Sequence, residues 1–263
     1  MANESDATPW VQAVRASHDR LAGIVAGLDG DALRAQSYDT EWSVADVLSH
    51  LGSGAEIFSL YVDAGVAGGD PPAPDDFKPI WEAWNARSPE EQAARSVAAN
   101  EALVTRIESL TPQQRADFHV VMFGSMPVDL AGVLGFRLSE HAVHAWDIAI
   151  TLDPAAKVAP DAVDLLVDRL PLLAGFLGKQ ASAPVAVAVT TAGPQRAFTL
   201  DTGGVTLAPA GEDDAPAAAL ALPAEALLRL VYGRLVYGRL DDEQDLRASG
   251  VTLTELNSVF PGF

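Results

Sequence analysis

Apolar residues recur every three to four positions through the first 150 residues, a period that predicts amphipathic helices. In residues 8–28 they share one face, which is formed by Trp10, Val14, Leu21, Ile24, Val25 and Leu28. The same period returns in residues 43–64, 88–110 and 128–152. Four helices joined by short and medium connections predict an antiparallel four-helix bundle.

Capping residues at the starts of these segments support the prediction. Ser43 is a favourable N-cap, and Asp46 three residues later completes the pattern of a capping box. Ser88 followed by Pro89 begins the third helix, because proline suits the first helical turn. Residues 65–76 are rich in Gly, Pro and Asp, and we expect them to form an exposed polar loop that borders a pocket.

The pattern changes after residue 153. One more helix is expected over residues 161–179, and then short segments alternate Val, Ala and Thr with the period of two that is typical of strands. The strands are expected at 184–191, 196–201, 204–208 and 217–222, and two last helices at 223–233 and 252–260. We therefore predict an α+β protein of two domains: a helical bundle over residues 1–155 and a smaller α+β domain with an antiparallel sheet over 156–263.

The charge and composition exclude several classes of function. The chain has 263 residues and a net charge of −19, with no cluster of Lys and Arg, so nucleic acids and anionic membranes are not expected partners. It has no cysteine, so it forms no disulfide and has neither a Cys nucleophile nor a Cys-ligated zinc. The first nine residues do not resemble a signal peptide, and no stretch approaches ~20 apolar residues, so we expect a cytoplasmic protein.

Candidate chemistry lies on the fourth predicted helix. Arg137, Glu140, His144 and Asp147 fall within about 80° of one another at 100° per residue, on a helix that is otherwise largely apolar. Ionisable groups on such a helix are costly unless they are paired or coordinate a metal. Glu140 and His144 have the i, i+4 spacing that lets two side chains bind one metal ion.

A third ligand must come from another helix, and the candidate is His50, near the middle of the second helix and at the edge of its apolar stripe. Two imidazoles and a carboxylate, with one position open, are typical of catalytic zinc sites and also suit other divalent metals. Asp46 and Asp147 are expected to accept hydrogen bonds from the ligand imidazoles.

Structural explanations compete with this hypothesis at every position. A stripe of Arg, Glu, His and Asp on a helix is often a salt-bridge face, and from the spacing alone this is the more common outcome. His18 is expected to be structural or a pocket residue, and His141 is expected to face solvent or a loop. Trp42 and Trp146 are most simply core residues.

Two motifs resemble those of a known family. The segment 42–51, WSVADVLSHL, and the segment 137–147, RLSEHAVHAWD, resemble the second- and fourth-helix signatures of the mycothiol-dependent maleylpyruvate isomerase family, within the DinB-like bundle superfamily. The C-terminal part resembles the smaller α+β domain of the same family at residues 227–233, at Gly238-Arg239, at Gly250 and at the closing residues 260–263. The resemblance therefore covers nearly the whole chain.

The resemblance implies a function and roles for particular residues. His50, Glu140 and His144 take the places of the family's metal ligands, the metal is usually zinc, and the cosubstrate is the small thiol mycothiol. A metal-bound thiolate would add to a cis double bond, allow rotation and leave again. An arginine of the C-terminal domain would bind the anionic substrate. Here RLVYG at 229–233 is repeated at 234–238, a departure from the family pattern, and both Arg234 and Arg239 are candidates, with Arg239 slightly favoured.

Three functions remain open at this point. An isomerase acting on a small unsaturated diacid needs a cationic anchor, for which Arg137, Arg234 and Arg239 are available. A mycothiol S-transferase acting on other electrophiles needs a roomier apolar pocket, lined by Phe58, Tyr61, Trp81 and Trp84. In a non-enzymatic binding module the metal site would be vestigial, but the intact set of three ligands argues against this. The sequence leaves open whether the protein is a monomer or a dimer.

Overall fold

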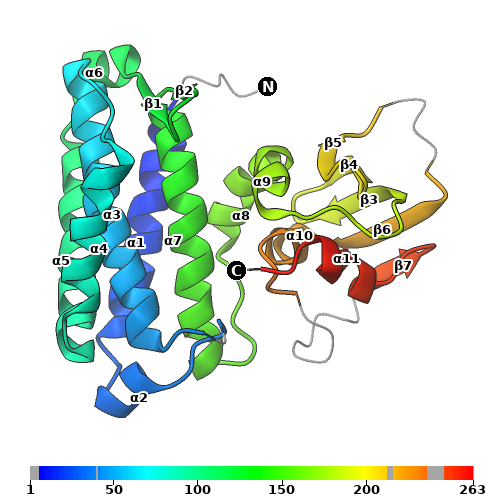
Figure 1. The fold of residues 1–263 in the computed structure, drawn as a ribbon, viewed down its shortest axis with the longest axis horizontal. Coiled ribbons are helices and arrows are strands. Elements are labelled where there is room, and N and C mark those ends of the chain that lie inside the picture. Colours follow the sequence, from blue (N-terminus) through cyan, green and yellow to red (C-terminus); the bar gives the residue numbers. More distant parts are fainter. Residues whose placement is uncertain (1–5, 40, 212–215, 236–245, 263) are drawn as a thin grey trace. The chain divides into compact units, whose positions relative to one another are not determined.

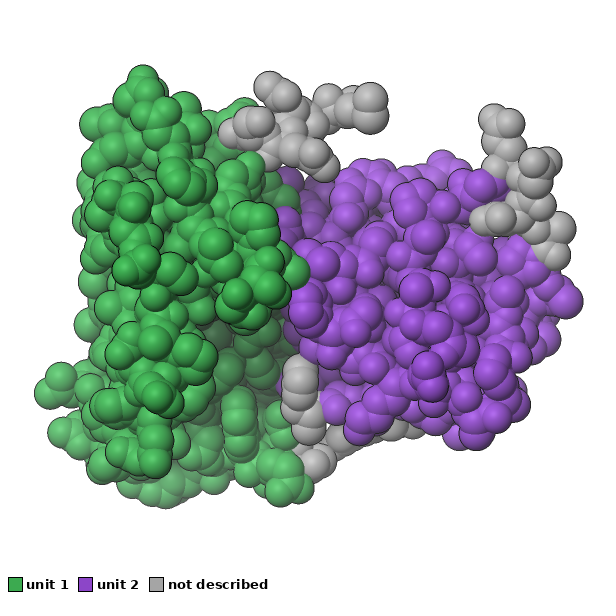
Figure 2. All heavy atoms as spheres, turned by 45° about the horizontal axis from the view of Figure 1, so that its top comes forward, with its two compact units in different colours: residues 1–153 green, residues 154–263 purple. Residues whose placement is uncertain are grey.

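The structure is a computed structural model that describes residues 6–39, 41–211, 216–235 and 246–262. Contacts along the chain divide it into two compact units, Met1–Asp153 and Pro154–Phe263, which Figure 2 shows in different colours. The first unit is helical apart from one small hairpin, and the second combines helices with a sheet (Figure 1). The predicted fold class, a helical bundle followed by an α+β part, is confirmed.

The first unit contains all four predicted long helices. Its elements are α1 (Thr8–Val25), α2 (Gly30–Arg34), α3 (Val44–Ala67), η1 (Pro74–Asp76), α4 (Phe77–Asn85), α5 (Pro89–Glu108), α6 (Pro112–Asp117), β1 (Val120–Met122), β2 (Met126–Val128) and α7 (Leu130–Leu152). The capping box predicted at the start of α3 is formed through Ser43, and Ser88, the predicted start of α5, also forms one with Glu91. These local signals explain why the helix starts could be read from the sequence.

The four long helices form the bundle. α1 packs against α5 and α7, and α3 packs against the same two helices (Figure 1). α3 and α7 are antiparallel, because His50 contacts Glu140 whereas the following residue, Leu51, contacts the earlier Arg137.

α3 and α5, in contrast, run in the same direction, since Leu51 contacts Asn100 and Asp63 contacts Arg106. The segment between them makes this possible. α4 returns the chain along α3, with Phe77 beside Tyr61 near one end and Trp84 over Gly52 nearer the other. The sequence pattern did not predict α4, because a helix of nine residues is too short for its apolar period to be recognised.

The unit's core is apolar and shared by several helices. One cluster of buried residues comprises Leu21, Leu33, Val44, Ala45, Val47, Leu48, Leu51, Ala93 and Ile148. The indole of Trp84 fills the space above Gly52, where an added Cβ would lie 2.1 Å from the ring. Burial of such side chains is the main favourable contribution to the stability of the bundle.

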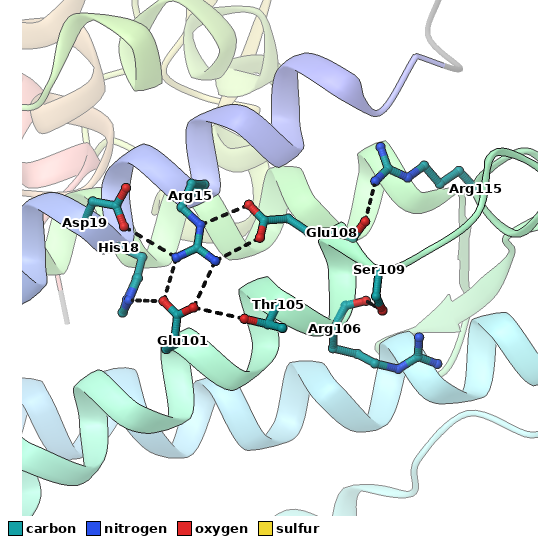
Figure 3. A network of polar contacts seen from close by, with 9 residues as sticks. All are labelled: Arg15, His18, Asp19, Glu101, Thr105, Arg106, Glu108, Ser109 and Arg115. Atoms are coloured by element: carbon teal, nitrogen blue, oxygen red, sulfur yellow. Dashed lines mark hydrogen bonds and ion pairs between the residues drawn. The ribbon is translucent and has the colours of Figure 1, made fainter.

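A polar network joins α1 to α5 at the surface (Figure 3). Arg15 forms ion pairs with Glu101, Glu108 and Asp19, and its Nη2 lies 2.9 Å from Glu108 Oε2. His18 Nε2 lies 2.9 Å from Glu101 Oε2. Because Arg15 contacts Glu108 and His18 contacts Glu101, α1 and α5 run antiparallel.

The second unit contains a five-stranded sheet and its helices. Its elements are α8 (Pro160–Leu166), η2 (Val167–Arg169), α9 (Leu170–Leu177), β3 (Ala186–Ala192), β4 (Arg196–Asp201), β5 (Thr206–Pro209), β6 (Ala218–Pro223), α10 (Ala224–Val231), β7 (Arg247–Ser249) and α11 (Leu253–Val259). The helix expected over 161–179 is interrupted at η2. Pro171 at the start of α9 has no backbone N–H to continue the helical hydrogen bonds.

The strand order is β5-β4-β3-β6-β7, and the sheet is mixed. Three pairings are antiparallel as expected, but β3 and β6 are parallel, with Val187 opposite Ala218. The hairpin of β4 and β5 lies between them in sequence, so β6 reaches β3 by a crossover connection. The alternation of apolar and polar residues along a strand predicts which face is buried. It does not predict whether a strand distant in sequence pairs with it in a parallel or an antiparallel direction.

A buried ion pair fixes the beginning of the second unit to α10. Glu225 accepts hydrogen bonds from Arg229 Nε at 2.8 Å and from the backbone N–H of Val158 at 3.0 Å. The motif at Leu227–Leu228–Arg229 therefore has a structural explanation, since Arg229 is 1% exposed and paired within its own helix.

Candidate metal centre

Three side chains from α3 and α7 converge at one place in the first unit. His50 Nε2 lies 3.1 Å from Glu140 Oε2, and His144 Nε2 lies 3.7 Å from the same oxygen. One ligand atom from each residue lies within 4.8 Å of the other two. The side chains of His50 and Glu140 are about one third exposed, at 34% and 35%, so the group opens to its surroundings.

Local structure explains how the sequence brings these groups together. Glu140 and His144 are one turn apart on α7, so their side chains lie one above the other. The capping box at Ser43 starts α3 and thereby sets the rotation of His50, which lies in the second turn. Because α3 and α7 are antiparallel neighbours, the faces that carry these residues meet.

Asp147 orients one of the imidazoles, as predicted. Its Oδ2 lies 2.9 Å from His144 Nδ1, and its side chain is fully buried. A carboxylate at Nδ1 holds the proton there, so the lone pair of Nε2 points toward Glu140. Asp46, the other predicted acceptor, makes no hydrogen bond to His50 among the described residues, because its carboxylate caps α3 through Ser43.

Trp42 lies against both imidazoles. Its ring centroid is 5.1 Å from that of His50 and 5.9 Å from that of His144. Trp42 packs against the core cluster, as expected, but it is only partly buried and also contacts the site. Trp146 is a core residue, 2% exposed, as expected.

The protonation states favour metal binding. Burial lowers the pKa of His50 by more than its hydrogen bond with Glu140 raises it, so the ring stays neutral at neutral pH. Burial raises the pKa of Glu140, but the hydrogen bond from His50 and, at the acid pH where this carboxyl titrates, the positive charges of His144, His50 and Arg137 outweigh it, so the pKa falls to about 2. A neutral imidazole and an ionised carboxylate are the forms that bind metal ions.

The donor set fits a divalent metal. Two imidazole nitrogens and one carboxylate oxygen match the ligands of catalytic zinc sites, and the carboxylate at His144 is the usual second partner of a metal-bound imidazole. A second group, formed by His18, Asp19 and Glu101, also has its donor atoms close together. There both carboxylates are already paired with Arg15 (Figure 3), which competes with a cation for their oxygens.

The three arginines predicted as substrate anchors lie in different places. Arg137 is in the first unit, 2% exposed, and its Nη2 donates to the carbonyl oxygen of Leu51 at 3.0 Å and to Asn100 Oδ1. Arg234 is in the second unit, 3% exposed, with Nη1 2.8 Å from the carbonyl oxygen of Tyr232. Arg239 lies outside the described residues.

Two histidines outside the candidate ligand set, His141 and His18, are buried. His141 was expected to face solvent or a loop, and this is wrong: it is 1% exposed, with Nδ1 2.8 Å from Ser17 Oγ. α7 is covered on nearly all sides, so the side next to the ligand stripe faces α1 rather than solvent. His18 is buried and paired with Glu101, as a structural histidine would be.

Aromatic rings form a row along α3 and α4. Adjacent ring centroids are 6.3 Å apart for Phe58 and Tyr61, 6.0 Å for Tyr61 and Phe77, and 5.9 Å for Phe77 and Trp81. Trp81 is 45% exposed. Trp84, which was expected to line the same pocket, is 1% exposed and belongs to the core.

Comparison with known proteins identifies the family. Residues 14–149, more than half of the chain, match the family model described as the mycothiol maleylpyruvate isomerase N-terminal domain. The chain belongs to this family. The resemblance inferred from the two helix motifs is thereby confirmed. All three residues of the candidate centre lie inside the region matched by the mycothiol maleylpyruvate isomerase family model.

Solved structures show the same fold over nearly the whole chain. The crystal structure of the mycothiol-dependent maleylpyruvate isomerase is similar with a TM-score of 0.67 and 13% identity, over 95% of both chains. The crystal structure of a histidine-to-alanine mutant of that isomerase gives the same values. No protein in the curated set matches this sequence. None of the described helices is long and apolar enough to cross a membrane.

Proposed function

We propose that this chain is a mycothiol-dependent metalloenzyme that isomerises a small cis-unsaturated acid of the maleylpyruvate type. The observation that carries the proposal is the convergence of His50, Glu140 and His144, with donor atoms within 4.8 Å of one another, in a member of this family. Zinc is the first candidate for the metal, because two imidazoles and one carboxylate are typical zinc ligands.

A divalent ion held by these residues would act as a Lewis acid that lowers the pKa of the mycothiol thiol, so that thiolate forms at neutral pH. The chain itself has no cysteine, so the sulfur must come with the cosubstrate. In the isomerisation a sulfur–carbon bond forms at the double bond, the resulting single bond rotates, and the same sulfur–carbon bond breaks. The thiol leaves unchanged, and there is no net oxidation or reduction.

The protein residues prepare the site for this chemistry. Asp147 fixes the tautomer of His144, and the lowered pKa values of His50 and Glu140 keep both ligands deprotonated at neutral pH. The anchor for the substrate carboxylate is proposed to be Arg234 or Arg239 in the C-terminal part. Nη2 of Arg137 already binds two oxygen atoms of the protein, which disfavours it for this role.

A mycothiol S-transferase is the second candidate. The row of rings from Phe58 to Trp81 supports it, because an apolar row that ends in the exposed ring of Trp81 favours a bulky apolar electrophile over a small diacid. Phe58 follows the candidate ligand His50 by two turns of α3. Its ring centroid lies 5.6 Å from the guanidinium carbon of Arg137. In this case the sulfur–carbon bond would persist in the product.

Elemental analysis beside a mycothiol titration tests the proposal. We expect about one zinc per chain, consistent with one three-ligand site, and a thiol-dependent change in the visible spectrum of the cobalt-substituted protein. Conversion of maleylpyruvate without consumption of thiol would support the isomerase, whereas loss of one thiol per turnover of another electrophile would support the transferase. Absence of metal after reconstitution would mean that the His50–Glu140–His144 group is structural, and would refute both.

A further inference from the structure

The guanidinium of Arg137 joins the two helices that carry the candidate ligands. Arg137 stands one turn before Glu140 on α7, and its Nη2 donates a hydrogen bond of 3.0 Å to the carbonyl oxygen of Leu51. Leu51 directly follows His50 on α3. The contact therefore joins the backbone beside the candidate ligand His50 to the side chain that stands one turn before the candidate ligand Glu140.

Asn100 on α5 holds this link from a third helix. Its Oδ1 accepts a hydrogen bond from the same Nη2 of Arg137, and its Nδ2 donates to the carbonyl oxygens of Leu51 at 3.4 Å and Ser96 at 2.9 Å. Asn100 is 2% exposed, as is Arg137. Three helices thus meet at one carbonyl oxygen beside His50.

This arrangement is costly for stability alone. Arg137 forms no ion pair with a carboxylate among the described residues, and burial lowers its pKa to about 10. A buried charge held mainly by neutral groups loses more solvation than apolar side chains of similar volume would. Gly54 makes room for it, because a Cβ at that position would lie 2.9 Å from Nη1. The contacts fix direction and distance, which an apolar contact would fix less well.

We propose that Arg137 and Asn100 are positioning residues for the metal centre, acting together through the Leu51 carbonyl oxygen. We name these three groups the brace. The brace sets the separation and rotation of α3 and α7 at the level of His50 and Glu140, so that the ligand atoms are in place before a metal arrives. The inference rests on the proposed function, since it assigns the brace a role only if this centre binds a metal.

The test compares N100A with V104A in the full-length protein. Val104 is also buried on α5, 2% exposed, so V104A removes core packing from the same helix without touching the brace. Affinity for Co²⁺ is measured by competition with a chelator, the visible absorption bands report the coordination geometry, and thermal unfolding reports stability. We expect N100A to weaken Co²⁺ binding by about 10-fold or more and to shift the bands, as is typical of mutations next to metal ligands.

We expect V104A to lower the melting temperature while leaving affinity and bands unchanged. Equal loss of affinity in N100A and V104A would overturn the inference, because affinity would then follow stability alone. R137K separates geometry from charge. Lysine keeps the charge, but its shorter side chain does not bring an N–H donor to the position of Nη2, so we expect R137K to resemble N100A. Normal binding by R137K would also overturn the inference. Failure of the unmodified protein to bind Co²⁺ would instead refute the proposed function.

Discussion

Asp147 Oδ2 lies 2.9 Å from Nδ1 of His144, which leaves Nε2 of the same ring facing Glu140. One imidazole therefore contacts two carboxylates that have different roles. Asp147 is fully buried and orients the ring, whereas Glu140 is one third exposed and shares the candidate metal centre. This division between an orienting carboxylate and a candidate metal ligand leads to the first two predictions.

Replacing His144 by alanine should remove most of the bound metal and most of the activity. The ligand set would fall to two groups, which do not hold zinc tightly. Metal content per chain and far-ultraviolet circular dichroism measure the two effects, and we expect the helical signal to be retained. H119A is the control, since His119 is exposed and lies outside the centre. An H144A protein with full metal content would refute the ligand assignment.

Replacing Asp147 by asparagine should weaken metal binding by roughly 10–100-fold, the usual range for loss of a carboxylate behind a ligand imidazole. Asparagine keeps the size of the side chain but removes the charge that holds the proton on Nδ1. Chelator competition at neutral pH measures the change. Unchanged affinity would mean that the tautomer of His144 is fixed by other contacts.

Trp42 should report metal binding. Its indole packs on both His50 and His144, so Co²⁺ at the centre should quench its fluorescence. The chain has five tryptophans, and we expect W42F to remove most of the quenching seen during a Co²⁺ titration. W81F should retain it, because Trp81 is exposed and belongs to the row on α4. Equal quenching in W42F and the unmodified protein would place the metal elsewhere.

The Arg15 network should make stability depend on acid pH. Hydrogen bonding by Arg15, and then by Thr105, lowers the pKa of Glu101 from 4.5 to about 2. The folded state thus favours ionised Glu101, and this contribution to stability is complete above pH 4.5 and is lost as the pH falls toward 2. The carboxylate is half exposed, so solvent screens the effect and it should be modest.

E101Q is the variant that tests this dependence. We expect it to lower the melting temperature at pH 6–7 and to converge with the unmodified protein near pH 2–3. E56Q, which removes an exposed carboxylate without an ion pair among the described residues, is the control. A constant difference between E101Q and the unmodified protein across this pH range would contradict the assignment.

Two glycine substitutions should have opposite effects. G52A places a methyl group 2.1 Å from the ring of Trp84, so overpacking should destabilise the protein by about 1–3 kcal/mol. Gly23 is exposed on α1 with nothing within 4 Å of an added Cβ, so G23A should stabilise it by about 0.4–1 kcal/mol. Chemical denaturation measures both free energies. A neutral G52A would mean that α4 can move away from α3.

The sequence predicted what depends on neighbouring residues. Ser43 with Asp46 and Ser88 with Glu91 form their capping boxes within four residues, so the starts of α3 and α5 could be read directly. The spacing of Glu140 and His144 is likewise local. The β1–β2 hairpin was missed, because strands of three residues carry too little alternation to be recognised.

The remaining features depend on distant parts of the chain. The sequence did not show whether His141 faces solvent or another helix. α7 is apolar on nearly all sides, so its pattern marks no exposed face from which the direction of His141 could be inferred. The link from Arg137 to Asn100 requires α5 to lie beside Leu51 of α3, and this placement depends on the return of the chain through α4. No spacing in the sequence contains that information.

All three candidate ligands precede Pro154, so the complete donor set belongs to the first unit. Ribosomes add about 5–20 residues per second, and the second unit therefore takes several seconds to synthesise. Helical bundles fold in microseconds to milliseconds. The nascent chain thus has time to fold its bundle and compete for an ion before synthesis ends. Maturation of the centre would then depend on the metal supply around the ribosome rather than on delivery to the finished protein.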